Sequence, residues 1–116
     1  MTNDKLYDIT MIRDMLGDDR ELRRMIGIFL ESTPVSLNDL NEGFREDDAD
    51  KIARNAHKMK SSLDMLRVID LHNDVRKVDK EHKVEDIPQV ELEAIVTKMN
   101  VVLEEVFEQL REEFNL

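Results

Sequence analysis

The scarcity of glycine and proline constrains this chain more than any other feature of its sequence. Three glycines and two prolines occur among 116 residues, and neither type occurs between Ala49 and Ile87. Turns between strands depend on both residue types, whereas helix interiors exclude them. Aromatic residues, which strands favour, make up only 4% of the chain. The sequence therefore predicts an all-helical fold.

Apolar residues recur every three or four positions, which is the spacing of one face of a helix. We count six such stripes: Ile9, Ile12 and Leu16; Leu22, Met25, Ile26 and Phe29; Leu37, Leu40 and Phe44; Ile52, Ala56, Met59, Leu63 and Leu66; Val68, Leu71, Val75 and Val78; and Leu92, Ile95, Met99, Val102, Leu103, Val106, Leu110 and Phe114. Each stripe predicts an amphipathic helix, and the last predicts a long one.

Residues typical of helix ends separate the stripes. Gly17 predicts a left-handed C-cap, and Asp18 predicts the N-cap of the next helix, which we expect to run to about Glu31. Thr33 followed by Pro34 predicts a fresh start, because threonine is a good N-cap and proline fits the first helical position.

Further boundaries follow in the second half of the chain. The acidic residues 46–48 predict a turn and an N-cap, and the change of phase between the fourth and fifth stripes predicts a break near Arg67–Ile69. Residues 80–86 are almost wholly polar and predict a connection. Pro88 then precedes the last helix.

Several amphipathic helices joined by short links can bury their apolar faces only against one another. We expect an antiparallel up-and-down four-helix bundle with one or two extra short N-terminal helices. A coiled coil is the alternative, but the stripes are interrupted too often for sustained heptads. A length of 116 residues suits one domain, so residues 1–116 are expected to form a single unit.

Charge and residue usage exclude several classes of function. The formal net charge of −10 disfavours binding to a nucleic-acid phosphate backbone, and the lack of cysteine excludes disulfides and thiolate chemistry. No leader-like segment and no apolar run of membrane-spanning length occurs in the sequence. We therefore expect a cytoplasmic protein without membrane contact, and a monomer.

The segment from Ile52 to Ser62 is the part of the chain most suited to chemistry. His57 follows the core position Ala56, so it is expected at the border of the buried stripe. Arg54, Lys60, Ser61 and Asp64 share its side of the helix at spacings of three, three, four and seven. A histidine at such a border is packed on one flank and open to a partner on the other.

The charge of this segment is opposite to that of the rest of the chain. Residues 51–60 contain Lys51, Arg54, Lys58 and Lys60 and no acidic residue. A local excess of cations in an acidic protein indicates that an anion binds there. A neutral imidazole beside that anion has a nucleophilic nitrogen at neutral pH.

Four motifs of this chain together resemble the histidine-containing phosphotransfer (HPt) domain. In chain order they are Leu16-Gly17-Asp18-Asp19, similar to Leu-Gly-Asp-Asp; Phe29-Leu30-Glu31-Ser32-Thr33-Pro34, similar to Phe-Leu-x-x-x-Pro; Asp48-x-x-x-Ile52-x-x-x-Ala56-His57, similar to the approach to the histidine; and Ala56-His57-x-Met59-Lys60-Ser61-Ser62, similar to Ala-His-x-Leu-Lys-Gly-Ser. The resemblance covers roughly residues 8–80.

The resemblance implies a helical phosphoryl carrier of a phosphorelay, that is, of two-component signalling. His57 would accept a phosphoryl group from the aspartate of a response-regulator receiver domain and pass it to another receiver, below an upstream sensor histidine kinase. Lys60 would stabilise the phosphoryl group. Arg54, Lys58, Ser61 and Asp64 would contact the partner.

The same resemblance implies no cofactor on this chain and no autonomous kinase activity. Mg²⁺ is expected on the receiver, which brings its own acidic pocket. The sequence itself contains no ATP-binding segment, and it lacks the paired Glu-x-x-His units of a di-metal bundle, the nearest match being Asp79-x-x-His82. We expect His72 and His82 to be structural or solvated.

Two departures from the family pattern leave an alternative open. Ser61 stands where the family has glycine after the lysine, and Arg67 stands where a second glycine is frequent. A non-transferring HPt-like module that docks or sequesters a receiver is therefore the second hypothesis. An enzyme with His57 as general base ranks last, because no second catalytic group lies at a supporting spacing.

Overall fold

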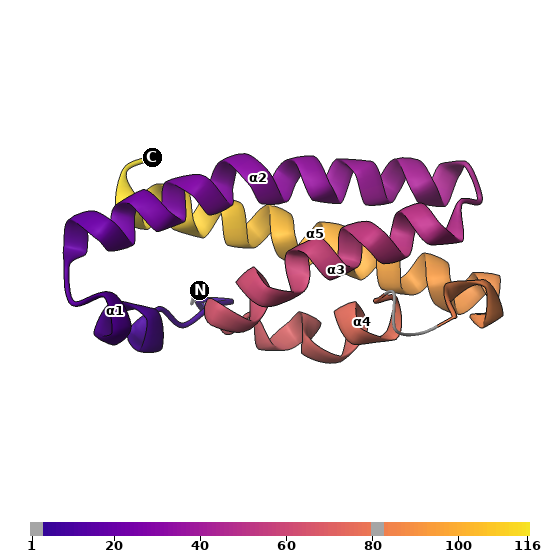
Figure 1. Cartoon of the computed structure of the whole chain (residues 1–116), viewed down its shortest axis with the longest axis horizontal. Coiled ribbons are helices and arrows are strands. Elements are labelled where there is room, and N and C mark those ends of the chain that lie inside the picture. Colours follow the sequence, from indigo (N-terminus) through magenta and orange to yellow (C-terminus); the bar gives the residue numbers. More distant parts are fainter. Residues whose placement is uncertain (1–3, 80–82) are drawn as a thin grey trace.

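The computed structural model describes residues 4–79 and 83–116. Within these ranges the chain is helical and contains no strand, which confirms the all-helical prediction. The elements are α1 (Thr10–Leu16), α2 (Asp19–Arg45), α3 (Ala49–Met65), α4 (His72–Lys77) and α5 (Gln89–Phe114), with short 3₁₀ helices η1 (Ile69–Leu71) and η2 (Val84–Asp86) (Figure 1).

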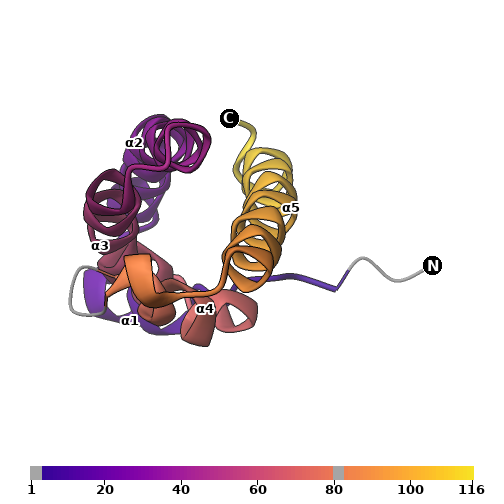
Figure 2. The ribbon, with the colours of Figure 1, turned by 90° about the vertical axis from the view of Figure 1, so that its right-hand side faces the viewer.

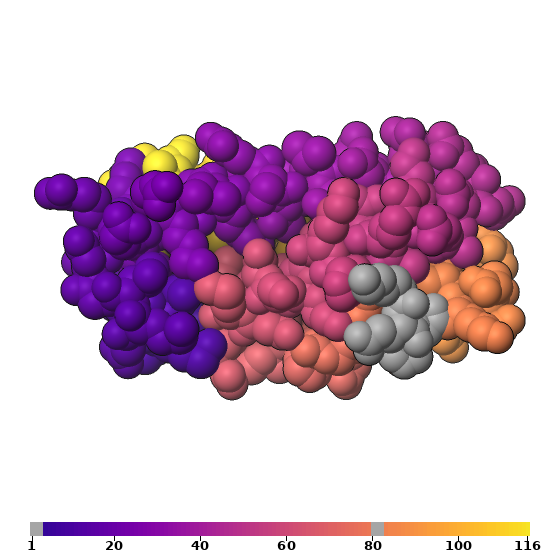
Figure 3. All heavy atoms as spheres, viewed as in Figure 1, coloured from indigo at the N-terminus to yellow at the C-terminus, as the bar shows by residue number. Residues whose placement is uncertain are grey.

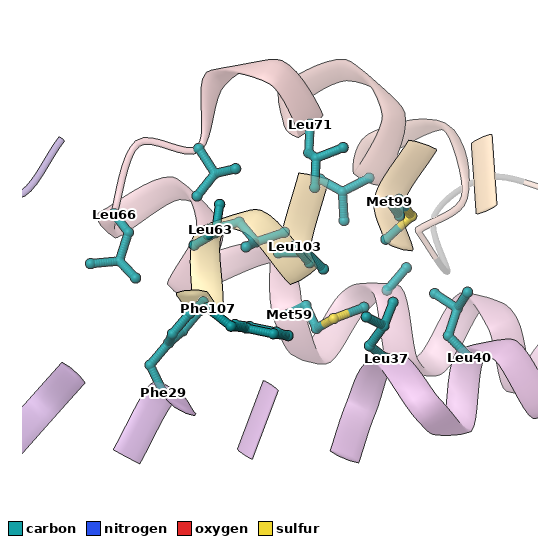
Figure 4. Close-up of a cluster of buried hydrophobic side chains, with 14 of the residues drawn as sticks. Phe29, Leu37, Leu40, Met59, Leu63, Leu66, Leu71, Met99, Leu103 and Phe107 are labelled. Carbon is teal, nitrogen blue, oxygen red and sulfur yellow. The ribbon is translucent and has the colours of Figure 1, made fainter. Parts of the chain in front are cut away.

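The helices α2 and α3 form a hairpin, and α3 runs back from the turn as a neighbour of α2 (Figures 1 and 2). Viewed from the end, α2, α3, α4 and α5 surround a common interior, and α4 lies between α3 and α5 (Figure 2). Side chains from α2, α3 and α5 fill this interior (Figure 4). Phe29 of α2 and Phe107 of α5 meet edge to face, with 5.8 Å between ring centroids.

Local sequence accounts for several helix ends. Gly17 has the left-handed φ of 64° that its predicted C-cap role requires. The side chains of Asp18 and Asp48 accept hydrogen bonds from the backbone N–H groups of Arg20 and Lys51, so both predicted N-caps are confirmed. The chain also breaks where predicted, because α3 ends before Arg67, whose φ is 50°.

The predicted restart at Thr33 is wrong, since α2 continues through Pro34 without a break. Thr33 is only 3% exposed and lies on the same buried face as Phe29 and Leu37, four residues away on either side. A continuous helix buries all three on one stripe, which outweighs the backbone hydrogen bond that proline removes, a cost of about 3 kcal/mol.

The predicted connection over residues 80–86 is only partly described. Lys80, Glu81 and His82 lie outside the described residues, and Val84–Asp86 form η2 before Pro88. The prediction for His82 therefore stays a prediction.

Polar contacts attach α5 to α2 and to the N-terminal segment. Asn41 of α2 and Asn100 of α5 donate to each other's side-chain oxygen at 2.7 and 2.8 Å. Near the N-terminus, the Tyr7 hydroxyl donates to Glu113 at 2.5 Å, and the Leu6 N–H donates to Gln109 at 2.9 Å. No described helix combines the length and hydropathy that a bilayer-spanning segment needs.

Candidate functional site

The helix α3 places His57 at the edge of the core. Its neighbours Ala56 and Met59 are buried, whereas the side chain of His57 is 39% exposed. Figure 3 shows α3 at the surface between α2 and the segment of η1 and α4. The imidazole is therefore open to solvent on one side and held by the protein on the other.

The residue that contacts the ring on the protein side is Asp79. It follows α4 and is 2% exposed. One carboxylate oxygen, Oδ1, lies 2.9 Å from Nδ1 of His57, and the other, Oδ2, lies 2.5 Å from Nζ of Lys60. A single buried carboxylate thus bridges the two side chains. Among the described residues, Nε2 of His57 has no hydrogen-bond partner.

Asp79 is not predicted at this site from the sequence, because 22 residues separate it from His57. A signal was nevertheless present. Leu71, Val75 and Asp79 are spaced by four, and the first two are fully buried. An acidic residue that extends a buried apolar stripe needs a partner in the interior. Here the partners are His57 and Lys60 of α3.

The predicted basic segment is largely compensated by acids, all of them from outside residues 51–60. Lys51 pairs with Glu42 at 2.7 Å, and this hydrogen bond lowers the pKa of Glu42 and raises that of Lys51. Arg54 pairs with Asp50 at 2.8 Å, one turn earlier on α3. Three of the four cations therefore have acidic partners, which come from α2, the start of α3 and the segment after α4.

The remaining predicted contact residues lie on the outer side of α3. Lys58 and Ser61 are exposed. Asp64 is half-buried and accepts a hydrogen bond from Arg76 of α4 at 2.7 Å, which raises the pKa of Arg76. His72 of α4 lies 3.7 Å from Asp64, so this histidine belongs to a surface ion-pair group and not to the His57 site.

A small apolar recess adjoins this surface between α2 and the end of α3. Its volume is about 100 Å³, and Ile28, Phe29, Ser62 and Met65 are among its lining residues. Ile28 is half exposed, at 51%. Ser62 directly follows Ser61, which lies one turn from His57, so the recess and the histidine lie close together along α3.

Comparison with known families agrees with the motifs on α2 and α3. The family model for the Hpt domain matches residues 24–113, which is most of the chain and includes all of the site residues discussed above. Comparison with curated proteins and with solved structures found no match.

Proposed function

The chain belongs to the Hpt domain family, and on that basis we propose that it carries phosphoryl groups on His57 between partners of a phosphorelay. Members of this family act in histidine phosphotransfer, with receiver domains and kinases as partners. The proposal goes beyond the family assignment in three ways. It names His57 as the acceptor residue and Lys60 as the stabilising cation, and it has the phosphoryl group pass from one receiver to another.

The observation that carries the proposal is the orientation of the His57 ring. Its Nδ1 lies 2.9 Å from the buried carboxylate of Asp79, the side chain is 39% exposed, and no described residue hydrogen-bonds Nε2. A nucleophile that attacks phosphorus needs a free lone pair and a fixed direction of approach. The described residues around His57 supply both.

The transfer itself exchanges one bond for another. Nε2 attacks the phosphorus of the aspartyl phosphate, a nitrogen–phosphorus bond forms, and the bond from phosphorus to the aspartate oxygen breaks. The aspartate leaves as a carboxylate, and Mg²⁺ in the receiver's pocket neutralises charge on the phosphoryl oxygens. Lys60, one turn from His57, adds a cation on the side of the carrier.

The exposed side of α3 is proposed as the receiver-docking face. Arg54, Lys58, Ser61 and Asp64 surround the histidine there, and the apolar recess extends the same surface toward α2. Residues three or four apart share one side of a helix, so a partner centred on His57 meets these side chains together.

The proposed architecture is the up-and-down four-helix bundle of the family. The ring of α2, α3, α4 and α5 in Figure 2 supports it, with α4 as the short member and α1 as the extra N-terminal helix. As a carrier the protein would act as a monomer, would hold no cofactor and would have no kinase activity of its own.

Incubation with a ³²P-labelled phosphorylated receiver domain tests the acceptor. Label should move to the wild-type chain and not to His57→Gln, and the product should be stable in alkali and labile in acid, as expected of a phosphoramidate. Arg111→Gln, which changes an exposed residue of α5 outside the proposed docking face, serves as the matched control for folding. Label on His57→Gln equal to that on wild type would refute the assignment.

The second candidate is a receiver-binding module that does not transfer. One contact favours it, because Lys60 already pairs with Asp79 at 2.5 Å. Such a module would bind a receiver with the same affinity in wild type and His57→Ala, and no label would reach either chain. Calorimetric titration beside the labelling assay separates the two functions.

A further inference from the structure

We infer, building on the proposed function of His57, that Met25 and Met65 form an oxidation-sensitive pair within the receiver-docking face. A peroxide converts these two thioethers to sulfoxides, and the polar products weaken receiver binding. Because methionine sulfoxide can be reduced again enzymatically, the modification is reversible.

The sulfur chemistry of this chain belongs to methionine alone. The sequence contains seven methionines and no cysteine, so thioethers are the only sulfur groups that an oxidant meets. Met59 and Met99 are 1% and 0% exposed and lie within the core (Figure 4). Because oxidation depends on access to the sulfur, these two methionines are protected in the folded protein.

Met25 and Met65 differ from the buried methionines because they line an opening in the surface. Both pack against the core and remain partly exposed, Met25 on α2 and Met65 at the end of α3. They belong to the lining of the recess of about 100 Å³ between these two helices. A recess of this size has room for more than one water molecule, so a peroxide molecule can enter it.

The recess lies within reach of a partner that docks on His57. Met65 follows His57 by eight residues, which places it about 12 Å along α3 and about 80° around the helix axis, on the side of α2. A standard interface buries about 800 Å² on each partner, equivalent to a disc with a radius of roughly 16 Å. A receiver centred on His57 therefore covers Met65 and the recess.

Oxidation changes the polarity of the recess without a change of net charge. A sulfur lone pair forms a bond to one oxygen of hydrogen peroxide, the oxygen–oxygen bond breaks, and the other oxygen leaves as water with both protons. The sulfur is oxidised by two electrons, and the peroxide is reduced. Apart from Ser32 and Ser62, the side chains that line the recess are apolar, so the S–O dipole replaces an apolar contact.

A receiver that covers the oxidised recess has to bury this dipole. Burial of a polar group without a compensating hydrogen bond should weaken receiver binding by about 10- to 100-fold. The oxidised carrier then meets fewer receivers, so phosphotransfer through His57 declines although the histidine itself is unchanged.

The test compares each chain with its own untreated sample. The full chain is treated with hydrogen peroxide, the peroxide is removed, and a receiver domain is then added in a calorimetric titration. Peptide mass spectrometry identifies the methionines that carry an added oxygen. The wild type should lose about 10-fold or more of its affinity. Treatment with methionine sulfoxide reductases for both sulfoxide epimers should restore the affinity.

Two leucine variants identify the sulfur atoms responsible. The double variant Met25→Leu/Met65→Leu keeps an apolar lining of similar volume without a thioether, so peroxide should not lower its affinity. Met15→Leu is the matched control, because Met15 of α1 is 70% exposed and does not line the recess. This control should lose affinity as the wild type does. If the double variant does not fold by circular dichroism, Met65→Leu alone should give partial protection.

The results separate the oxidation-sensitive pair from the proposed function. Full affinity in a wild type whose Met25 and Met65 are oxidised would overturn the inference. Equal losses in the wild type and the double variant would do the same, as would oxidation of Met15 with Met25 and Met65 left intact. An untreated wild type that binds no receiver or accepts no label on His57 would instead overturn the proposed function.

Discussion

Gly43 of α2 lies directly against Ile52 of α3, so that a Cβ atom on the glycine would be 3.1 Å from the Ile52 backbone nitrogen. The same Cβ would be 3.1 Å from Cβ of Lys51. The backbones of the hairpin therefore approach closely near the turn that precedes the histidine, and a side chain at position 43 would require the start of α3 to move by a few tenths of an ångström.

Gly43→Leu should destabilise the protein by about 1–3 kcal/mol, because the larger side chain must push α2 and α3 apart. Gly27, also within α2, has no atom of a neighbouring residue within 4 Å of the place that a Cβ would take. Gly27→Ala should therefore stabilise the helix by about 0.5–1 kcal/mol through helix propensity alone. Urea denaturation measures both, and equal effects of the two substitutions would contradict the close approach at Gly43.

Arg67→Gly should stabilise the protein by about 1 kcal/mol, because Arg67 has a φ of 50° that costs energy in any residue with a Cβ atom. The exposed side chain contributes little packing that could be lost. Arg67→Ala is the matched control, since it removes the side chain and keeps the strain. A glycine variant no more stable than the alanine variant would show that the backbone strain is not relieved.

The raised pKa of the Tyr7 phenol predicts that the protein loses stability in alkali. Its burial and its hydrogen bond to Glu113 raise the pKa of this phenol above the usual range. The folded state therefore retains the phenol proton more strongly than the unfolded state, and this stabilisation is complete below about pH 10 and is lost as the pH rises further. Tyr7 is the single tyrosine and the chain has no tryptophan, so tyrosinate absorbance reports on it directly.

In the wild type, tyrosinate should appear together with the loss of helical circular dichroism. Tyr7→Phe should reduce the dependence of stability on pH above about 10. Ionisation of the phenol near pH 10 in a fully helical protein would contradict the raised pKa.

Lys60→Ala should slow transfer from a phosphorylated receiver by about 100-fold, because one charge-stabilising donor is removed from the phosphoryl group. Lys60→Arg retains the charge and should recover part of the rate. Lys98→Ala, which removes an exposed lysine of α5 outside the proposed docking face, controls for the loss of one positive charge. Rapid-quench measurement gives all three rates, and equal rates in the Lys98 and Lys60 alanine variants would exclude a specific role for Lys60.

The stripes of apolar residues predicted the helices well because burial on one face determines both spacing and length. The misplaced boundary at Pro34 has a physical cause. Thr33 is a good N-cap in isolation, but its position between Phe29 and Leu37 places it on the buried face of a continuous helix. Packing against the rest of the protein decided between two locally reasonable structures.

The candidate site could be predicted only in part. His57 and its neighbours lie on one helix, where spacing determines which side chains share a side. Asp79 comes from a segment beyond α4, and its contact with His57 depends on how α4 packs against α3. The compensation of Lys51 by Glu42 depends on the α2–α3 hairpin in the same way. Contacts across helices follow from tertiary packing, which spacing along one segment does not determine.

The reciprocal amide pair of Asn41 and Asn100 has a consequence for the uniqueness of the fold. Apolar faces tolerate sliding, because one aliphatic side chain can replace another in a contact. A slide of α5 along α2 by one turn, about 5.4 Å, would instead separate the two amides. The side-chain N–H and C=O groups of both residues would then lose their mutual hydrogen bonds while staying partly buried. The pair therefore discriminates against misaligned packings and favours a single alignment of the two longest helices.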